Sequence, residues 1–505
     1  MIQSLQQIWY GLTLAALPHN LLYAFIGSVL GTLVGVLPGL GPVTTIAVLL
    51  PVTYQVGDAL GAIIMLAAIY YGAMYGGSTT SILLKVPGEA ASVVTCIDGY
   101  EMARQGRAGP ALAIAAIGSF IAGTVSIFAL GLVGPAFAKV AISFGPPEFF
   151  ALAVLGLALS ATLSGGSPVR GLCMVLAGLL LGIVGIDTVT GVDRFTFGSM
   201  EVRDGIELVP LLMGLFGLGE ILFNLEEKGA FTLLSTRIGR LFPSRQDWID
   251  SRGAIARGSV LGFVIGLIPG GGAILGSLLS YTIEKKVSKT PELFGKGAIA
   301  GVAGPESANN SAASASFIPL LTLGLPGNAV TAVLFAGLLI QNVQPGPLMM
   351  AKNPDVFWGV ISSMYIGNVM LLILNLPLVG LWVQLLRVPF WILGPAVLVV
   401  AIFGTYSLRT NWFDISILMA SGAVGYVFRK ASLDAGPLVM AFILANILDT
   451  SLRQALLMGD GSMTIMMMRP ISASILGIAV LVIVSQIYAH LARRRRLLVS
   501  AGSSP

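Results

Sequence analysis

Two glycine-rich motifs interrupt apolar stretches at points where backbone amides could bind an anion. The first is Pro38-Gly39-Leu40-Gly41-Pro42 and the second is Pro269-Gly270-Gly271-Gly272. Glycine lets a ligand approach the backbone because it has no Cβ, and a helix that follows begins with unpaired N–H groups and a positive dipole end. The alternative is that these glycines only permit close helix packing. The candidate substrate ligands here, including two hydroxyls of the first turn, are Gly39, Gly41, Thr44, Thr45, Gly270, Gly271 and Gly272.

A second pair of motifs places polar residues inside apolar stretches. Gly76-Gly77-Ser78-Thr79-Thr80-Ser81 precedes Lys85 and Pro87-Gly88, and its expected counterpart, Pro305-Glu306-Ser307-Ala308-Asn309-Asn310-Ser311, precedes Pro326-Gly327-Asn328. Polar groups in lipid need partners and commonly line a pathway, although Ser and Thr can also bond back within their helices. Amide and backbone carbonyl oxygens suit Na⁺, because hard cations take oxygen ligands. We expect Na⁺ ligands among Glu306, Asn309, Asn310 and Ser311, and further substrate ligands among Ser78, Thr79, Lys85, Gly88, Gly327 and Asn328.

Two charged residues in these motifs have several interpretations. Glu306 is either a proton or cation site, or a structural partner of Lys296 or of a backbone amide. Lys85 lies in an apolar run, where a lysine near the bilayer centre costs about 3 kcal/mol. Three interpretations of Lys85 are open: its side chain extends to the cytoplasmic interface, it pairs with Glu89 one helical turn on, or it faces the substrate cavity.

The composition places all four motifs in a membrane protein. Of the 505 residues, 56% are hydrophobic and only 10% are charged, whereas a soluble domain carries about 25% charged residues. Lipid must therefore be the solvent over most of the chain. The net charge of +5 is explained by basic cytoplasmic loops, without nucleic acid. With two His, two Cys, no P-loop and no HExxH, we expect no enzyme, no ATP-driven pump and no organic cofactor.

Matches that recur in the same order indicate two homologous halves. Ser28–Gly41 and Ser259–Gly272 share eight of fourteen residues, and Leu84–Ala90 matches Leu323–Ala329. Paired Gly/Pro-interrupted segments in two halves point to the binding site of a transporter. We predict an all-α polytopic membrane protein with about 11–12 membrane segments, including spans at 58–76 and 291–307. The first repeat is expected over 20–225 and the second over 253–490.

The basic residues predict the orientation of these halves. Six Lys and Arg between 224 and 257 and the Arg493–Arg496 run assign the 226–252 connecting loop and the 491–505 tail to the cytoplasm. Lys285 and Lys286 return to that side only if the second glycine motif tips a re-entrant hairpin. Each repeat is therefore expected to contain a Gly/Pro-tipped re-entrant hairpin, and the two repeats to have inverted topology. Residues 1–19 are expected to form an interfacial helix.

Longer stretches of the chain resemble the large membrane subunit of the tripartite tricarboxylate transporter family. In the first half they are GTLVGVLPGLGPVTTIAVLLP from Gly31, IYYGAMYGGSTTSILL from Ile69 and VPGEAASVVTCIDGYEMARQGRAG from Val86. In the second half they are GLIPGGGAILG from Gly266, PESANNSAA from Pro305 and LTLGLPGNAVTAVLFAGLLIQNVQPGPL from Leu321. The resemblance covers essentially the whole chain. It departs at Lys85, where the family pattern suggests a small polar residue such as Asn.

The resemblance implies a multi-pass permease of a bacterial inner membrane with a cytoplasmic C-terminus. Its implied partners are a small four-helix membrane subunit and a periplasmic solute-binding protein. Its implied activity is uptake of citrate and other di- and tricarboxylates, driven by a gradient of Na⁺ or H⁺. An uncoupled organic-anion channel is the alternative, because half-helix dipoles would serve it equally well. A membrane-embedded enzyme is a third hypothesis, and it lacks a His/Asp or metal constellation.

Overall fold

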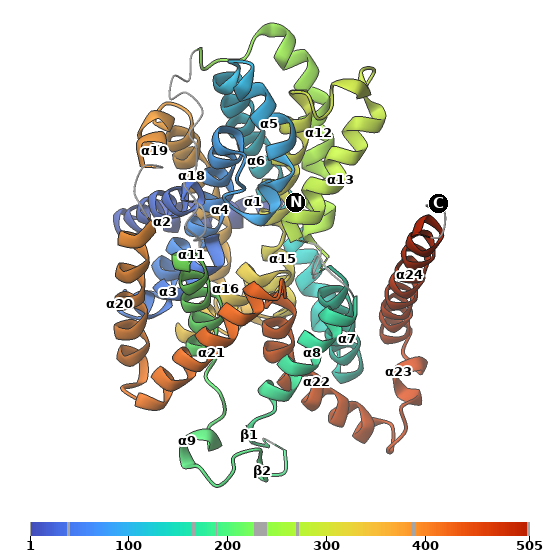
Figure 1. The fold of residues 1–505 in the computed structure, drawn as a ribbon. Coiled ribbons are helices and arrows are strands. Elements are labelled where there is room, and N and C mark those ends of the chain that lie inside the picture. Colours follow the sequence, from blue (N-terminus) through green and yellow to red (C-terminus); the bar gives the residue numbers. More distant parts are fainter. Residues whose placement is uncertain are drawn as a thin grey trace. The chain divides into compact units, whose positions relative to one another are not determined.

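The computed structural model describes residues 2–37, 41–163, 168–187, 189–226, 240–268, 272–385 and 390–501, and these are almost entirely helical (Figure 1). Within these ranges the only strands are β1 (Gly185–Ile186) and β2 (Asp193–Arg194), which pair antiparallel. The helices up to residue 226 are α1 (Ile2–Ala15), α2 (Pro18–Val36), α3 (Gly41–Tyr54), α4 (Ala59–Leu84), η1 (Ala90–Val93), α5 (Thr95–Arg104), α6 (Ala108–Ile142), α7 (Pro146–Leu163), α8 (Pro168–Gly182), α9 (Met200–Arg203), α10 (Leu208–Leu212), the π-helical η2 (Met213–Leu218) and α11 (Gly219–Glu226). Those that follow are α12 (Arg245–Gly266), α13 (Gly272–Val287), η3 (Pro291–Leu293), α14 (Ala300–Ala315), α15 (Phe317–Leu323), α16 (Ala329–Ile340), α17 (Met349–Lys352), α18 (Pro354–Asn375), α19 (Val379–Leu385), α20 (Phe390–Arg409), α21 (Trp412–Lys430), α22 (Gly436–Met458), α23 (Thr464–Met468) and α24 (Pro470–Ala501).

The lengths and compositions of these helices confirm an all-α polytopic membrane protein. In the described part of the chain, six helical stretches are long and apolar enough to cross a membrane: α2, α4, α6, Leu208–Glu226, α18 and α22. Six shorter apolar helices accompany them, among them α3, α8 and α16. The apolar window of α4 is 94% buried inside the chain, so this helix belongs to the protein core and has little surface left for lipid.

The chain divides into two compact units, each made of two separate segments. The first unit comprises Met1–Ala141 and Val209–Tyr426, and the second comprises Ile142–Leu208 and Val427–Pro505. Each unit therefore draws one segment from each predicted repeat. The repeat boundaries and the inverted topology stay predictions.

In the first unit, α2 packs along α4, and α12 packs along α14. Both contacts are made by glycines four residues apart, at which an added Cβ would lie 2.3 to 2.5 Å from a backbone oxygen of the facing helix. Only glycine allows backbones to approach so closely. The first glycine ladder sets Gly27, Gly31 and Gly35 against Met65, Ile69 and Ala73, and the second sets Gly258, Gly262 and Gly266 against Gly304, Ala308 and Ala312.

The two halves of the first unit also contact each other in a reciprocal way. The arm α3 packs on α16, and the arm α13 packs on η1. In the same manner α4 contacts α16, and α14 contacts α5. The centre of this unit is thus built from both halves of the chain.

The N-terminal helix α1 lies against α18. The Ser362 hydroxyl donates to the Ile8 carbonyl at 3.0 Å, and the Tyr10 hydroxyl donates to Asp355 at 2.7 Å. Trp9 is 71% exposed, so this side of α1 is not covered by the described part of the chain. Helix α1 lies within the 1–19 stretch, and an interfacial helix there stays a prediction.

In the second unit, α22 packs on α7 and α8, and α24 packs on α7. The buried Glu148 accepts from Arg469 Nε at 2.7 Å, which ties α7 to the start of α24. After α8, the loop is held by Arg194, which lies 2.5 Å from Asp187 and 3.1 Å from Asp449. Hydrogen bonds from Thr190 and from the backbone, together with Arg194, lower the pKa of Asp187 from its ordinary value.

Three helix boundaries differ from those expected from the sequence. Helix α4 continues to Leu84 through the expected end at residue 76, because the polar residues beyond it have partners inside the protein. Helix α12 begins at Arg245 inside the expected connecting loop, where Ser244 and Asp247 form a capping box. The span expected from residue 291 begins at Ala300, since 291–293 form only the short η3.

Candidate functional site

Two helix breaks in the first unit have the same local structure. The C-cap residue of α4 is Lys85, with φ 61°, and the C-cap residue of α15 is Gly324, with φ 69°. Both C-caps therefore have left-handed backbone conformations. A Pro-Gly pair follows each cap. The next helical segments begin at Glu89 and at Asn328, each of which closes a capping box with a hydroxyl three residues later. The sequence match between these segments therefore corresponds to a repeated backbone path.

The glycine ladders define which residues of the two halves correspond. Met65, Ile69 and Ala73 of α4 match Gly304, Ala308 and Ala312 of α14, an offset of 239 residues, and Gly88 and Gly327 differ by the same number. At this offset Tyr70 corresponds to Asn309, and Glu89 corresponds to Asn328.

One hydrogen bond joins each break to the opposite half. Asn309 Nδ2 donates to Glu89 Oε1 at 3.0 Å, and Asn328 Nδ2 donates to the Tyr70 hydroxyl at 3.1 Å. Under the correspondence above, these two bonds are counterparts of each other. A side chain of α4 or α14 thus holds the N-cap of the other half's break, and the two breaks face a common centre.

Glu306 lies at this centre and is fully buried. Its carboxylate accepts hydrogen bonds from the hydroxyls of Ser78, at 2.6 Å, and Thr95. These hydroxyls occupy both carboxylate oxygens, and Lys296 contributes none of the contacts. In the described part of the chain, neither Glu306 nor Glu89 forms an ion pair with a basic residue.

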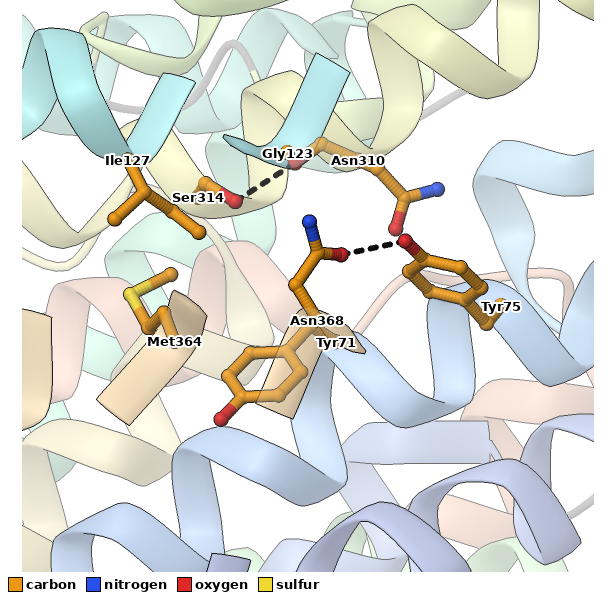
Figure 2. Close-up of a pocket in the computed structure, with 8 residues that line it drawn as sticks. All are labelled: Tyr71, Tyr75, Gly123, Ile127, Asn310, Ser314, Met364 and Asn368. Carbon is orange, nitrogen blue, oxygen red and sulfur yellow. Dashed lines mark hydrogen bonds between the residues drawn. The ribbon is translucent and has the colours of Figure 1, made fainter. Parts of the chain in front are cut away.

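Asn310 lines a separate small cavity (Figure 2). The Asn310 amide nitrogen donates to Ser119 at 2.7 Å, while its Oδ1 is buried without a partner. Across the cavity, the Tyr75 hydroxyl donates to Asn368 Oδ1 at 2.5 Å. The space that the centre of a water molecule can occupy is about 10 Å³, which is close to the minimum for one water.

The four candidate Na⁺ ligands therefore lie in three different places. Glu306 and Asn309 both face the centre between the breaks, whereas Asn310 faces the small cavity. The Ser311 hydroxyl donates to the Ser259 carbonyl of α12 at 2.6 Å, so it ties α14 to the hairpin arm.

The hairpin tips are described only at their ends. Gly39, Gly270 and Gly271 lie outside the described residues. Gly41 and Gly272 open α3 and α13 with φ values of 54° and 55°, which favour glycine. A Cβ added to Gly272 would lie 3.7 Å from the Asn328 Cβ, so the second tip adjoins the second break.

The hydroxyls expected at the first tip have partners within the protein. Thr44 Oγ1 donates to the Phe216 carbonyl of η2 at 2.8 Å, and Thr45 Oγ1 donates to the Gly41 carbonyl at 3.0 Å. Thr79 is buried in α4. Thr80 Oγ1, which the sequence did not single out, donates to the Val36 carbonyl at 2.9 Å and so satisfies the C-terminal end of α2.

Lys85 is exposed, and its ammonium lies 5.3 Å from the centre of the Tyr100 ring. Glu89 does not pair with it, because the two Glu89 carboxylate oxygens accept from Asn309 and from the Ala91 backbone N–H. Of the three interpretations of Lys85, the geometry leaves an interface position or a substrate contact.

The sequence missed two residues of this centre, Glu89 as a carboxylate in its own right and Thr95 as a hydroxyl donor to Glu306. Glu89 could have been predicted from the sequence, because an acidic residue directly after a Pro-Gly pair in an apolar stretch needs a partner. Thr95 had no such signal, since it becomes part of the site only when α5 folds back onto α14.

Residues 21–440 match the model of a family described as the tripartite tricarboxylate transporter TctA family. Two relatives come from Agrobacterium vitis. An uncharacterized 52.8 kDa protein in the TAR-I ttuC' 3' region is 47% identical over 484 residues, which cover 96% of each chain. An uncharacterized protein in the TAR-II ttuC' 3' region is 46% identical over 223 residues, covering 44% of this chain and 92% of the relative. No solved structure matches the chain.

Proposed function

Because the chain belongs to the tripartite tricarboxylate transporter TctA family, we propose that it is the permease of a secondary transporter that imports small organic carboxylates. The substrates are di- and tricarboxylates. Uptake depends on a solute-binding protein and is driven by a cation gradient, with Na⁺ as the first candidate and H⁺ as the second. Family membership itself makes the chain a component of a tricarboxylate transporter.

The observation that carries the proposal is the reciprocal pair of bonds between the halves, Asn309 to Glu89 and Asn328 to Tyr70. Broken helices at the interface of two related halves are typical of secondary transporters, whose substrate and ion sites lie there. Movement of one half against the other would open such a centre to alternate sides of the membrane.

The substrate side of the centre is best supported at the second tip and second break. Gly272 opens α13, and Asn328 caps α16, so the unpaired first N–H groups of two helices start close together. Those N–H groups and the positive helix ends suit a carboxylate. Around Gly327 there is room, because a Cβ added there would meet nothing nearer than 3.8 Å.

The partners and location follow from the same proposal. We expect a small four-helix membrane subunit, a periplasmic solute-binding protein and a location in a bacterial inner membrane with the C-terminus in the cytoplasm. In this arrangement the binding protein delivers the carboxylate, and this chain moves it across the bilayer.

Reconstitution into proteoliposomes with the small subunit and the binding protein tests the function. Labelled citrate, succinate, malate and terephthalate would be offered with a gradient of Na⁺, of H⁺, or of neither. The proposal expects at least one carboxylate to accumulate above its external concentration under one cation gradient. Equilibration at the same rate without any gradient would identify the uncoupled channel instead, and failure to move any of the four would contradict carboxylate import.

A further inference from the structure

Two carboxylates are buried at the centre of the first unit, and no basic residue among those that the structure describes forms an ion pair with either. Glu306 is fully buried and Glu89 is 8% exposed. Glu306 accepts from the hydroxyls of Ser78 and Thr95, and Glu89 accepts from the Ala91 N–H at 2.6 Å and from Asn309. All of these donors are neutral. Buried charges are normally paired or bound to a metal ion, because an isolated buried charge costs many kcal/mol.

Asn309 lies between the two carboxylates. Its Nδ2 donates to Glu89, and it lies one helical turn from Glu306 on α14, with its amide beside that carboxylate. Its Oδ1 is fully buried and has no hydrogen-bond partner. A buried amide oxygen without a donor is itself a signal of a missing ligand, since such atoms are nearly always satisfied. A proton on one carboxyl group would give this oxygen a donor but would neutralise only one of the two acids, whereas a single metal cation would contact all three groups.

The remaining ionisable groups around the centre do not supply the charge. Cys96 on α5 and Tyr70 on α4 are neutral at ordinary pH. Lys85 points to the exposed side, over the ring of Tyr100.

We propose that Glu89, Glu306 and Asn309 form one Na⁺ site shared by the two halves of the chain, with the Ser78 and Thr95 hydroxyls beside it. Oxygen atoms of carboxylate, amide and hydroxyl are the ligands that hard cations take. This inference deepens the proposed function, because it names the coupling ion and adds Glu89 to its ligands. Asn310 and Ser311 lie outside this site, because Asn310 lines the separate small cavity and the Ser311 hydroxyl donates to the Ser259 carbonyl.

The second place between the halves, formed by the counterparts of these residues, lacks the charges. At the offset of 239 residues, the counterparts of Glu306, Ser78 and Thr95 are Ala67, Phe317 and Leu334, all buried and apolar. Glu89 corresponds to the neutral Asn328. The proposal therefore predicts a single site of this kind in the first unit.

Binding of Na⁺ to the purified full-length chain tests this without any transport assay. Thermal unfolding would be followed in detergent while Na⁺ replaces K⁺ at constant ionic strength, because a ligand that binds only the folded state raises the unfolding temperature. Glu89→Gln and Glu306→Gln keep the side-chain shape and remove the charge. Each should raise the Na⁺ concentration for half-maximal stabilisation at least tenfold, about 1.4 kcal/mol. The exposed Glu292→Gln is the matched control and should leave it unchanged.

The outcomes separate the proposal from its rivals. A wild-type response to pH but not to Na⁺ would identify a proton site and overturn the inference, as would a wild-type Na⁺ response in both glutamine variants. If those variants do not fold, the milder Thr95→Ala should still weaken Na⁺ binding. Carboxylate uptake that needs no Na⁺ would contradict the Na⁺ site and leave carboxylate import intact. Na⁺ binding without carboxylate uptake would support the Na⁺ site and contradict the proposed import.

Discussion

The Pro-Gly pairs of the two breaks offer a matched test, because their glycines have different surroundings. A Cβ added to Gly88 would lie 2.0 Å from the Gly35 carbonyl oxygen and 2.6 Å from the Gly77 Cα. A Cβ added to Gly327 would meet only the Ser316 Cβ, at 3.8 Å. Gly88→Ala is therefore expected to force a backbone displacement that Gly327→Ala does not require.

The size of the effect follows from the contact distances. Unstrained heavy atoms stay roughly 3.5 Å apart, so the Gly88 methyl group requires the end of α2 or the break to move by about 1.5 Å. Both obstacles are backbone atoms and cannot rotate away. Overpacking of a closed interior typically costs about 1–3 kcal/mol, and we expect Gly88→Ala at the upper end of that range. For Gly327→Ala we expect less than about 0.5 kcal/mol.

The assay is thermal unfolding of both purified variants beside the wild type, combined with carboxylate uptake. We expect Gly88→Ala to lower the unfolding temperature and the amount of protein in the membrane. Gly327→Ala should keep both, and a loss of uptake in that stable variant would place Gly327 at the substrate. Equal unfolding temperatures for the two variants would refute the packing argument.

Three further predictions concern other parts of the chain. Lys85 has the left-handed backbone that Gly324 has in the second half, so Lys85→Gly should keep or raise the unfolding temperature while Lys85→Val lowers stability by about 1 kcal/mol. The pKa of Asp187 is lower in the folded chain than in the unfolded one. The ionised carboxylate therefore stabilises its loop above the unfolded-state pKa, and this stabilisation is lost as the pH falls through the lowered value. Hydrogen exchange of residues 185–194 should increase below about pH 4, and Asp187→Asn should abolish that change. If the repeats are inverted, cysteines placed at the exposed Gln55 and Lys286 will be labelled from opposite sides of the membrane, and labelling from one side would contradict the inversion.

Local sequence signals were sufficient to predict most of the fold. Apolar runs of span length predicted the helices. The glycine-rich motifs predicted where α3 and α13 begin, since φ values near 55° at Gly41 and Gly272 favour glycine. Helix ends were harder to predict. The polar run after residue 76 looked like the end of a span, yet α4 continues because Ser78 and Thr80 bond to α14 and α2.

The correspondence between the two polar clusters was predicted incorrectly. The hairpin motifs are 231 residues apart and the breaks are 239 residues apart, so the second half contains eight more residues between hairpin and break (239 − 231 = 8). Pairing the Gly76 cluster with the Pro305 cluster ignores this insertion. According to the glycine ladders, the counterpart of Asn309 in the first half is Tyr70 and not a residue of the Gly76 cluster. Such packing contacts exist only in the folded chain and are absent from a comparison of motifs.

Under the proposed function, the two crossings between the halves would let related structures bind ligands of opposite charge. Both use the same geometry, a side chain of α4 or α14 on the N-cap of the other half's break. At the crossing of Asn309 with Glu89, the neighbour Glu306 adds a second carboxylate. At the crossing of Tyr70 with Asn328, the corresponding neighbour is Ala67, and the Phe317 ring lies 6.1 Å from that of Tyr70. A negative crossing attracts a cation, while a neutral crossing beside two helix N-termini suits an anion. Each half therefore contributes one acid to the first crossing and none to the second, and the proposed coupling ion and carboxylate would be held at separate places on the same interface.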